Sequence, residues 1–599
     1  MLRRRTLIAS AAAAVPAAAP ARSPAAANGT GPKTLRLGLA ATETQLDPVQ
    51  TESSRYTTQV LAGIFEAPLR FDYLARPTTL QPATAAAMPE ITPDGQQITV
   101  RIRPGIRFAD DPAFGGKPRE LIAADYVYAI KRFYDPRWNS SDLYLFEDAK
   151  IVGLSELRRE ALKSRKPFDY DRPVEGAVAL DRYTFRLRFA EPAPRFVYNL
   201  AHPYLTGAVA REVVERYGSD IGSHPVGTGP FRLVSWRRGS LLVLERSPSY
   251  RGDPYAGEPA DVPQARAIAR GLAGRRLPLV DRLEFHIIEE QQPLWLSFLG
   301  GQLDTIEVPG GFGALAVPNG ELAPFLRKRG IRLDLSQAPD MSMSFFNGDD
   351  PVVGGNAPEK VALRRAIALA HDSAQWRRLV RGGLAVPAQS VIPPFTSGFD
   401  EAYRSEMSEH DPAKARALLD LYGYVDRDGD GWRELPDGRP LTLRIAALQN
   451  QAARDGNEIW HRSLQRVGIR VQFEIAGWAE MLKRARAGTL QIWGYAWSAA
   501  SPDGSFFLSI GYGPNASESN DARFSLPAYD RLYERQRRLP DGPERAALMH
   551  EAKNMLVAYM PYKVHGHRLQ ADLVHPWVQH YWRHPFMRDV YHYLDVDPH

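Results

Sequence analysis

Carboxylates recur at alternate positions in the stretch DRDGDGWRELPD, which spans residues 426–437. Asp426, Asp428 and Asp430 are the first, third and fifth residues of this stretch, and Asp437 is the last. Calcium loops of the helix–loop–helix type place oxygen ligands at these same positions, because Ca²⁺ prefers carboxylate and carbonyl oxygens. The spacing therefore raises the hypothesis of calcium binding, which the flanking elements have to support.

The residues around this stretch predict a helix before it and a strand after it. Asp411-Pro412 is a typical helix start, whereas Pro436 and Pro440 exclude a helix on the far side. The segment LTLRIAAL (441–448) then alternates as a strand does. We therefore expect a helix-to-strand connector whose aspartates accept backbone N–H groups in Asx turns. Ca²⁺ binding by the first three aspartates stays open as the alternative.

Histidines, which often bind metals, crowd toward the end of the chain. Seven of the 14 follow residue 564: His565, His567, His575, His580, His584, His592 and His599. His565 and His567 share one face of a strand if that segment is extended, but the other spacings are irregular and HExxH is absent. We expect no metal site here, with a metal or haem site as the alternative. The chain has no cysteine, which excludes thiol chemistry.

Contiguous catalytic motifs are absent from the sequence. GxSxG, SxxK near KTG, and HExxH do not occur. We therefore expect no catalytic residues and no enzyme activity. An exported hydrolase with a triad assembled from distant segments is the alternative, because one sequence does not reveal such a triad.

The N-terminal residues predict export. The chain begins with a basic segment, MLRRR, which is followed by a short apolar stretch, TLIASAAAAV. The alanines that end at Ala27 resemble a cleavage site. This order is typical of a signal peptide, which we therefore expect at residues 1–27. Without the four arginines of this segment the chain has 71 basic and 69 acidic residues, which gives no basis for a nucleic-acid partner. No later run reaches the ~20 apolar residues of a membrane span. We expect a periplasmic monomer, and not a lipoprotein because a lipid anchor needs a cysteine.

The 599 residues are too many for one small core. Strand-like alternation marks TLRLGLA (34–40), QQITVRIRPGIRF (96–108) and YTFRLRF (183–189). The second half alternates helices with strands, which predicts an α/β lobe. Residues 147–175 and 252–276 are expected to be irregular, because the first is highly charged and the second is rich in Gly, Pro, Ala and Arg.

Several stretches, in one order, resemble the peptide-binding branch of bacterial extracellular solute-binding proteins, the family 5 proteins that serve ABC importers. They are ITPDGQQITVRIRPGIRF with AADYVYAIKRFYDP, HPVGTGPFRLVSW with LERSPSYRG, GGQLDTIEV, MSFFN, VALRRAIALAHD, GGLAVPAQSVIPP, DPAKARALLDLYGYVDRDGDG and RAALMHEAKNMLVAYMPY. The resemblance covers residues 34 to 595. In HPVGTGPF the glycines supply backbone freedom and Pro230 fixes φ before a hairpin, so we expect that stretch to be architectural.

This resemblance implies an α/β, two-lobed periplasmic-binding-protein fold, type II-like, with an extra small domain in the N-terminal lobe. The implied limits are 28–290 for the N-terminal lobe, with the small domain at about 52–200, then 291–564 for the C-terminal lobe, and 565–599 returning to the first. The lobes are expected to close over a peptide or peptide-like solute, and an inner-membrane ABC permease is the implied partner. A non-peptide ligand such as haem or a metal chelate, or a blocked or modified peptide, is the alternative.

The resemblance also implies ligand-binding residues. Trp497 matches the tryptophan that lines the peptide pocket in relatives, where an indole offers apolar area and one N–H. Relatives carry an aspartate for the peptide's α-ammonium at the position of Ala500. Either Asp503 takes over this role, or the ligand presents no free amine, since an unpaired buried ammonium is costly.

Three further candidates are placed by the same resemblance. They are Asn347 in MSFFN, Tyr144 in DLYLF and Glu66 in IFEAPL. Two of them have a structural alternative: a turn or core role for Asn347, and a solvent-facing position for Glu66.

Overall fold

A long mixed β-sheet runs through the computed structural model, which describes residues 31–51 and 54–598. The predicted signal peptide lies outside these residues. The strand order is β16-β15-β17-β13-β18-β11-β1-β10-β9-β8, and β12 and β14 also pair with β18. The strands are β1 (Thr34–Leu39), β8 (Phe231–Arg237), β9 (Leu241–Arg246), β10 (Arg282–Ile287), β11 (Thr305–Glu307), β12 (Arg332–Gln337), β13 (Asp340–Phe346), β14 (Ala385–Val386), β15 (Thr442–Leu448), β16 (Arg470–Ala476), β17 (Ile492–Ser498) and β18 (Tyr562–Val574).

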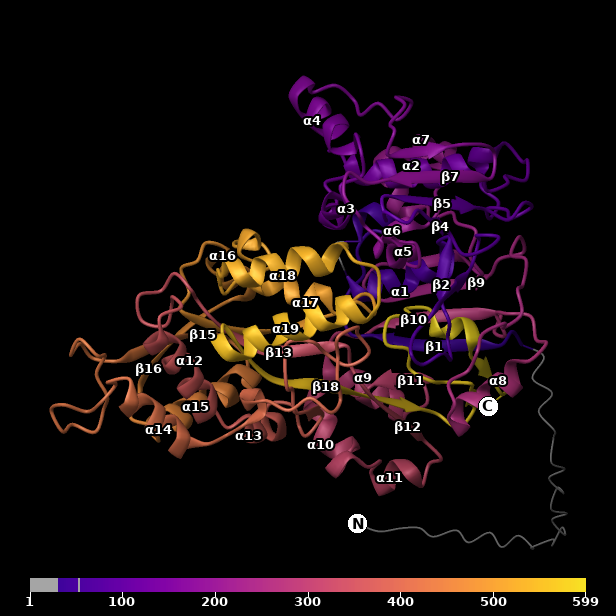
Figure 1. Cartoon of the computed structure of the whole chain (residues 1–599). Coiled ribbons are helices and arrows are strands. Elements are labelled where there is room, and N and C mark those ends of the chain that lie inside the picture. The colour runs from indigo at the N-terminus through magenta and orange to yellow at the C-terminus, as the bar shows by residue number, and fades with distance from the viewer. Residues whose placement is uncertain (1–30, 52–53, 599) are drawn as a thin grey trace, which may run out of the picture.

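Strand β18 belongs to both halves of this sheet. Its first residues pair with β13, in register Ser344↔Lys563, and its last residues pair with β12 and β11. Strand β11 in turn pairs with β1, at Leu37↔Thr305. Figure 1 shows β18 passing from the helix-rich half on the left to the half that holds β1 on the right. The lobe limits expected at 290/291 and 564/565 stay a prediction. The pairings nevertheless place β11 and β12 beside strands of the first half.

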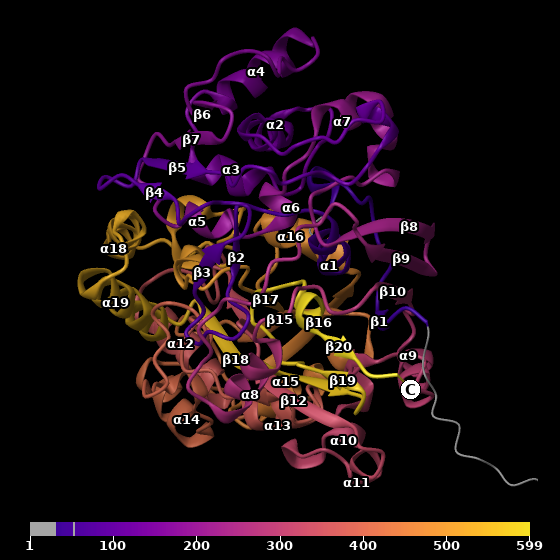
Figure 2. The same cartoon turned by 90° about the vertical axis from the view of Figure 1, so that its right-hand side faces the viewer.

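A separate four-stranded sheet lies within the range where a small domain is expected, about 52–200, and the limits of that domain stay a prediction. Its order is β4-β5-β7-β6, from β4 (Glu90–Ile91), β5 (Gln97–Arg101), β6 (Ala177–Ala179) and β7 (Thr184–Arg188). Helix α2 (Ala123–Tyr134) packs on β6 and β7. In Figures 1 and 2 this inserted domain stands at the top of the molecule. Its strands and helix follow the alternation and the amphipathic pattern read in the sequence.

Helices cover the sheets of the first half and of the inserted domain. They are α1 (Arg55–Ile64), α3 (Leu143–Ala149), α4 (Leu154–Ser164), α5 (Phe196–Asn199), α6 (Pro203–Thr206), α7 (Arg211–Tyr217), α8 (Pro263–Leu272), α9 (Gln291–Leu299), α10 (Gly313–Ala316) and α11 (Pro324–Arg327). The expectation of irregular chain at 147–175 and 252–276 is wrong in part, because α4 and α8 lie there. Helix α8 buries Ala265, Ile268 and Leu272, a helical spacing hidden by the surrounding arginines and glycines.

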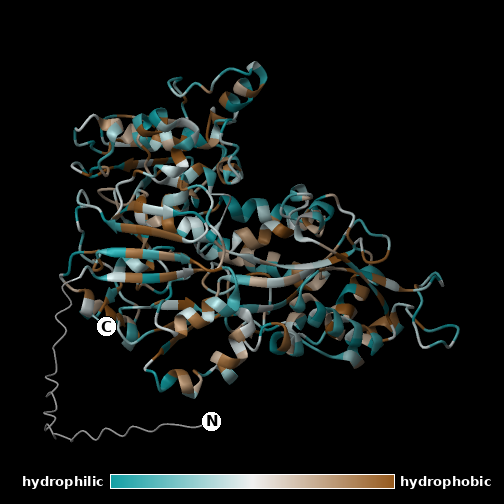
Figure 3. Ribbon diagram, turned by 180° about the vertical axis from the view of Figure 1, so that it is seen from behind, coloured by the Kyte–Doolittle hydropathy of each residue, from teal (hydrophilic) through white to brown (hydrophobic). Residues whose placement is uncertain are grey.

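The second half carries the predicted alternation of helices and strands. Its helices are α12 (Pro358–Ala370), α13 (Ser373–Leu379), α14 (Pro412–Leu421), α15 (Gln451–Gln465), α16 (Trp478–Arg486), α17 (Ser505–Leu508), α18 (Pro527–Arg538) and α19 (Pro543–Tyr559). Asp411 caps α14, since its carboxylate accepts the N–H groups of Ala413 and Lys414. In Figure 3 the hydrophobic colour gathers on the strands and inward helix turns, whereas the outer loops are hydrophilic. Among the described residues no helix is both long and apolar enough to cross a membrane.

The HPVGTGPF stretch enters the β8–β9 hairpin against the end of α1. A Cβ on Gly227 would lie 2.0 Å from the carbonyl oxygen of Ile64, and one on Gly229 would lie 2.6 Å from it. The Gly229 N–H donates to that carbonyl at 2.8 Å. Both glycines are therefore required for close backbone packing, which is the architectural role expected for them.

Candidate functional site

Strand β17 presents a row of aromatic side chains on one face. Trp493, Tyr495 and Trp497 alternate with small residues on the other face, as the period of a strand requires. Trp497 is half-buried and stacks on Phe506, with ring centroids 5.0 Å apart. The structure therefore leaves part of the Trp497 indole accessible at the end of this row, beside the segment 498–503. Its contact with a ligand stays a prediction.

Asp503 lies between two arginines from different parts of the chain. Arg195, from the inserted domain, forms an ion pair with Asp503, with 2.8 Å between its Nε and Oδ2. Arg545, at the start of α19, binds Oδ1, which also accepts from the Ser397 hydroxyl at 3.0 Å. Both carboxylate oxygens are thus engaged within the protein. A ligand ammonium at Asp503 would have to displace a guanidinium.

Further contacts join the inserted domain to the second half near this point. Arg195 also donates to the carbonyl of Leu539 at 2.9 Å, and Arg537 on α18 pairs with Glu191 at 3.0 Å. The His202 ring lies beside the backbone of Ala500. Burial and the nearby Arg588 lower the pKa of His202 to about 3, so its ring is neutral at pH 7. These contacts close the molecule over the segment that follows Trp497.

A cavity of about 350 Å³ lies between the start of α1, the end of β11 and the C-terminal segment. Its charged lining includes Arg55, Glu307, Asp572, Arg583 and Arg588. These residues are far apart in sequence and come together because β18 and the segment after it return to β11 and α1.

The cavity is linked to the segment 497–500 through charge. Arg568 on β18 lies 3.5 Å from the Ser498 hydroxyl, and its charge helps to lower the pKa of Glu307. The charge of Arg588 helps to lower the pKa of His202, which lies beside Ala500. We call the cavity of about 350 Å³ the cleft.

Glu307 is the central carboxylate of the cleft. Arg55 and Arg583 each bind its Oε2 at 2.9 Å. Burial alone would raise the pKa of Glu307, but Arg583 and Arg55 lower it to about 2. Arg583 also binds Asp572, which is almost fully buried. The cleft thus holds a compact ion-pair network in which arginines share the acidic side chains.

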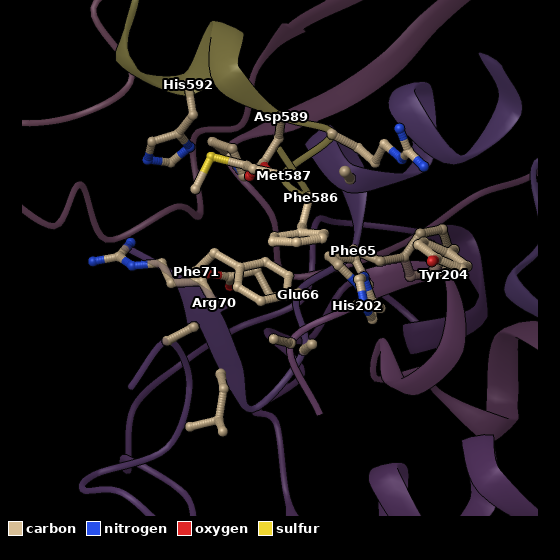
Figure 4. A pocket seen from close by; sticks show the side chains of 18 of the residues that line it. Phe65, Glu66, Arg70, Phe71, His202, Tyr204, Phe586, Met587, Asp589 and His592 are labelled. Carbon is tan, nitrogen blue, oxygen red and sulfur yellow. The ribbon is translucent and has the colours of Figure 1, made fainter. Parts of the chain in front are cut away.

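Glu66 lines a second, much smaller cavity of about 40 Å³ and not the cleft (Figure 4). Its carboxylate accepts hydrogen bonds from both terminal nitrogens of Arg251, at 2.7 and 2.8 Å, and from the Thr228 hydroxyl at 2.9 Å. Glu66 is only 8% exposed. It faces neither solvent nor ligand in this arrangement and instead anchors the glycine-rich stretch of the β8–β9 hairpin.

Asn347 and Tyr144 lie on different elements, Asn347 directly after β13 and Tyr144 on α3. The Asn347 amide donates to the carbonyls of Gly488 and Leu490, at 2.8 Å each, and its oxygen accepts from Asp349. This is a turn role, which was the structural alternative. Tyr144, on α3, is 58% exposed. Of the five candidates, the structure brings only Trp497 and Asp503 into the same segment, and ligand contact by any of them stays a prediction.

The C-terminal histidines are mostly buried single side chains. His565 binds the Ser344 hydroxyl at 2.9 Å and His567 binds the carbonyl of Asp340 at 2.6 Å. Burial lowers the pKa of both rings. In the part of the chain that the structure describes, the one acidic or histidine group with metal-ligand geometry is the 426–434 cluster, and it contains no histidine.

The loop at 426–437 is a connector between α14 and β15, and its Asx turns are confirmed. Asp428 accepts the N–H of Asp430 at 3.1 Å, and Asp430 accepts the N–H of Trp432 at 2.9 Å. Ligand atoms of Asp426, Asp428, Asp430 and Glu434 lie within 4.8 Å of one another. Asp437 instead pairs with its neighbour Arg439 at 2.8 Å. Glu434, rather than the expected twelfth residue, completes the acidic cluster.

The comparisons with known proteins identify the family. The sequence model of the bacterial extracellular solute-binding proteins, family 5 (middle part), matches residues 79–519. The chain belongs to this family. Di/tripeptide-binding protein 2 of Pseudomonas aeruginosa is 26% identical to this family 5 protein, over 90% of this chain and 91% of its own. Heme-binding protein A of Haemophilus influenzae is 23% identical, over 87% and 85%.

A solved structure confirms the fold of the family 5 protein. The periplasmic binding protein DppA of Helicobacter pylori, in complex with the peptide STSA, superposes with a TM-score of 0.69. It is 20% identical and covers 94% of this chain and 98% of its own. The α/β, two-lobed fold expected from the sequence is therefore correct. These relatives are named as binding proteins.

Sequence reasoning missed the residues that build the cleft. Arg55, Glu307 and Arg588 lie in three distant segments, without a shared spacing. Their proximity depends on the pairing of β18 with β11, which no local pattern predicts. The stretch RHPFMRD (583–589) carries two arginines close together, and this was the only local indication.

Proposed function

We propose that this family 5 protein captures a peptide or peptide-like solute in its cleft and delivers it to an inner-membrane ABC permease. The match to a di/tripeptide-binding protein over nearly the full length of both chains carries the proposal. A cavity of about 350 Å³ is within the range of small-ligand sites, ~300–1,000 Å³. The protein acts by binding, as a periplasmic monomer whose signal peptide is removed near Ala27.

The mechanism follows from contacts between distant segments. Arg195 and His202 of the first half meet Asp503 and Ala500 of the second half. These contacts exist only when the halves are close, so they stabilise the closed form. A solute that contacts both halves shifts the equilibrium further toward the closed form. The closed form is then the one that a permease recognises.

A blocked or modified peptide is the candidate favoured within this class. Ala500 offers no carboxylate, and both oxygens of Asp503 are held by arginines. A solute amine therefore lacks the anionic partner that a buried ammonium needs. Trp497 supplies an apolar wall in this proposal.

The test is calorimetry with a free-amine tripeptide and its N-acetylated form. Comparable affinities for the two forms are expected. A strong preference for the free amine would contradict the blocked-peptide assignment while leaving peptide binding intact. Native mass spectrometry of protein purified from its own periplasm provides the second readout, because a closed cleft retains its solute. Recovery of haem instead of a peptide would overturn the proposed function.

A further inference from the structure

Arg588 is an arginine of the cleft without a partner. It lines both cavities, and in the described part of the chain its guanidinium makes no hydrogen bond and no ion pair. Burial lowers the pKa of Arg588, and the guanidiniums of Arg55 and Arg583 lower it further. An arginine nevertheless stays protonated in proteins. Its five N–H donors are therefore present in the cleft and unused by the protein.

The three carboxylates that line the cleft are already engaged. Glu307 pairs with Arg55 and Arg583, each at 2.9 Å, and Asp572 pairs with Arg583. Glu289 accepts the backbone N–H of Thr42 at 3.0 Å. Arg588 is therefore the one of the three lining arginines that has no ion-pair partner among the described residues.

We propose that Arg588 binds a carboxylate of the solute, and so sets the class of solute that the cleft accepts. This inference rests on the proposed function and adds the chemistry of recognition. A carboxylate matches a guanidinium in bidentate geometry, with two parallel charge-assisted hydrogen bonds. Binding it compensates a charge that the empty cleft leaves unpaired.

The segment after Trp497 supports the same polarity. Ala500 offers no carboxylate there. His202, which lies beside Ala500, is neutral at pH 7 because its pKa is lowered to about 3. Neither residue therefore provides an anion for a cationic group of the solute, whereas Arg588 provides a cation for an anionic one.

The experiment measures the affinity of the mature protein for three tripeptides by calorimetry. All three are N-acetylated: tri-alanine with a free carboxylate, its C-terminal amide, and Ala-Ala-Glu amide, which carries its carboxylate on a side chain. At least one carboxylate form is expected to bind about tenfold or more tightly than the alanine amide. The preferred form also tells whether the C-terminus or an acidic side chain supplies the group. Equal affinities for all three peptides would overturn the inference and leave peptide binding intact.

Variants assign the effect to one residue. In Arg588→Gln the preference for the carboxylate is expected to disappear, while affinity for the alanine amide stays within about twofold. Arg588→Lys keeps the charge but loses the bidentate geometry, so it is expected to retain part of the preference. Arg246→Gln removes a paired arginine outside the cleft and is expected to keep the full preference. A full preference in Arg588→Gln would overturn the assignment.

Two outcomes separate the inference from the proposed function. Binding of all three peptides without discrimination refutes the role of Arg588 alone. Failure of the parent protein to bind any of them, even at millimolar concentration, refutes peptide capture and with it the inference. A thermal unfolding curve of each variant shows whether it is folded, and the comparison within the parent protein stands even if a variant is not.

Discussion

Replacing Asp503 with asparagine tests whether this carboxylate holds the protein together. The substitution keeps the shape and the bond from Ser397 but removes the charge between Arg195 and Arg545. The Arg545 side chain is only 2% exposed, so its charge becomes poorly compensated in a dry environment. Breaking a buried pair in this way costs ~3–5 kcal/mol. Arg545 keeps its exposed partner Asp541, which places the expected loss at the lower end, ~3 kcal/mol.

The assay is urea unfolding followed by tryptophan fluorescence. Asp503→Asn is expected to lower the free energy of unfolding by ~3 kcal/mol, whereas the control Asp541→Asn, at the exposed end of the same network, lowers it by less than ~1 kcal/mol. Equal losses for the two variants would refute the reasoning, since they would show that burial adds nothing to the Asp503 contacts.

The same variant separates stability from recognition. If the arginines hold Asp503, the ratio of affinities for a free-amine peptide and its N-acetylated form is unchanged in Asp503→Asn. A ratio that falls in the variant would show that Asp503 binds the ligand amine, which is the hypothesis that the sequence suggested.

Three further outcomes are expected. His565 has a pKa lowered to about 3 by burial and titrates near 6.5 when unfolded, so its contribution is complete above pH 6.5 and is lost as the pH falls. The stability lost between pH 6.5 and 5.5 should therefore be ~1 kcal/mol smaller in His565→Gln than in the parent, and equal slopes would contradict this. Ca²⁺ is expected to leave Tm unchanged, because the loop aspartates serve their own backbone. A rise in Tm that Asp428→Asn abolishes would establish a calcium site. Glu66→Gln is expected to lower the free energy of unfolding by ~3 kcal/mol or more in urea titrations, and no loss would show that the Arg251 pair is dispensable.

The sequence predicted the elements well where their pattern is local. The helix of residues 358–370, the Asp411 cap and the strand at 441–448 depend on apolar periodicity and capping chemistry that neighbouring residues contain. A local pattern also argued against the calcium hypothesis. The prolines after the loop exclude the second helix that a helix–loop–helix calcium site needs. Secondary structure that depends on neighbouring residues can therefore be predicted from a single sequence.

The candidate site was predicted far less completely. Glu66 and Asn347 are polar residues that the resemblance placed at the ligand, and in the structure both make internal hydrogen bonds. Arg588 and Glu307 meet only because a strand near the C-terminus pairs with β11. Such contacts depend on tertiary pairing over hundreds of residues. A single sequence carries no periodicity that encodes them.

Strand β18 also constrains the order in which this protein folds. Its residues, Tyr562–Val574, lie between β13 of one half and β11 of the other, yet they are synthesised long after both. Until they emerge, β13 and β11 each lack a hydrogen-bonding neighbour, and both halves present an open sheet edge. The sheet is thus completed only after β18 has been synthesised. A chain truncated before Tyr562 is expected to aggregate rather than to yield an independent first lobe.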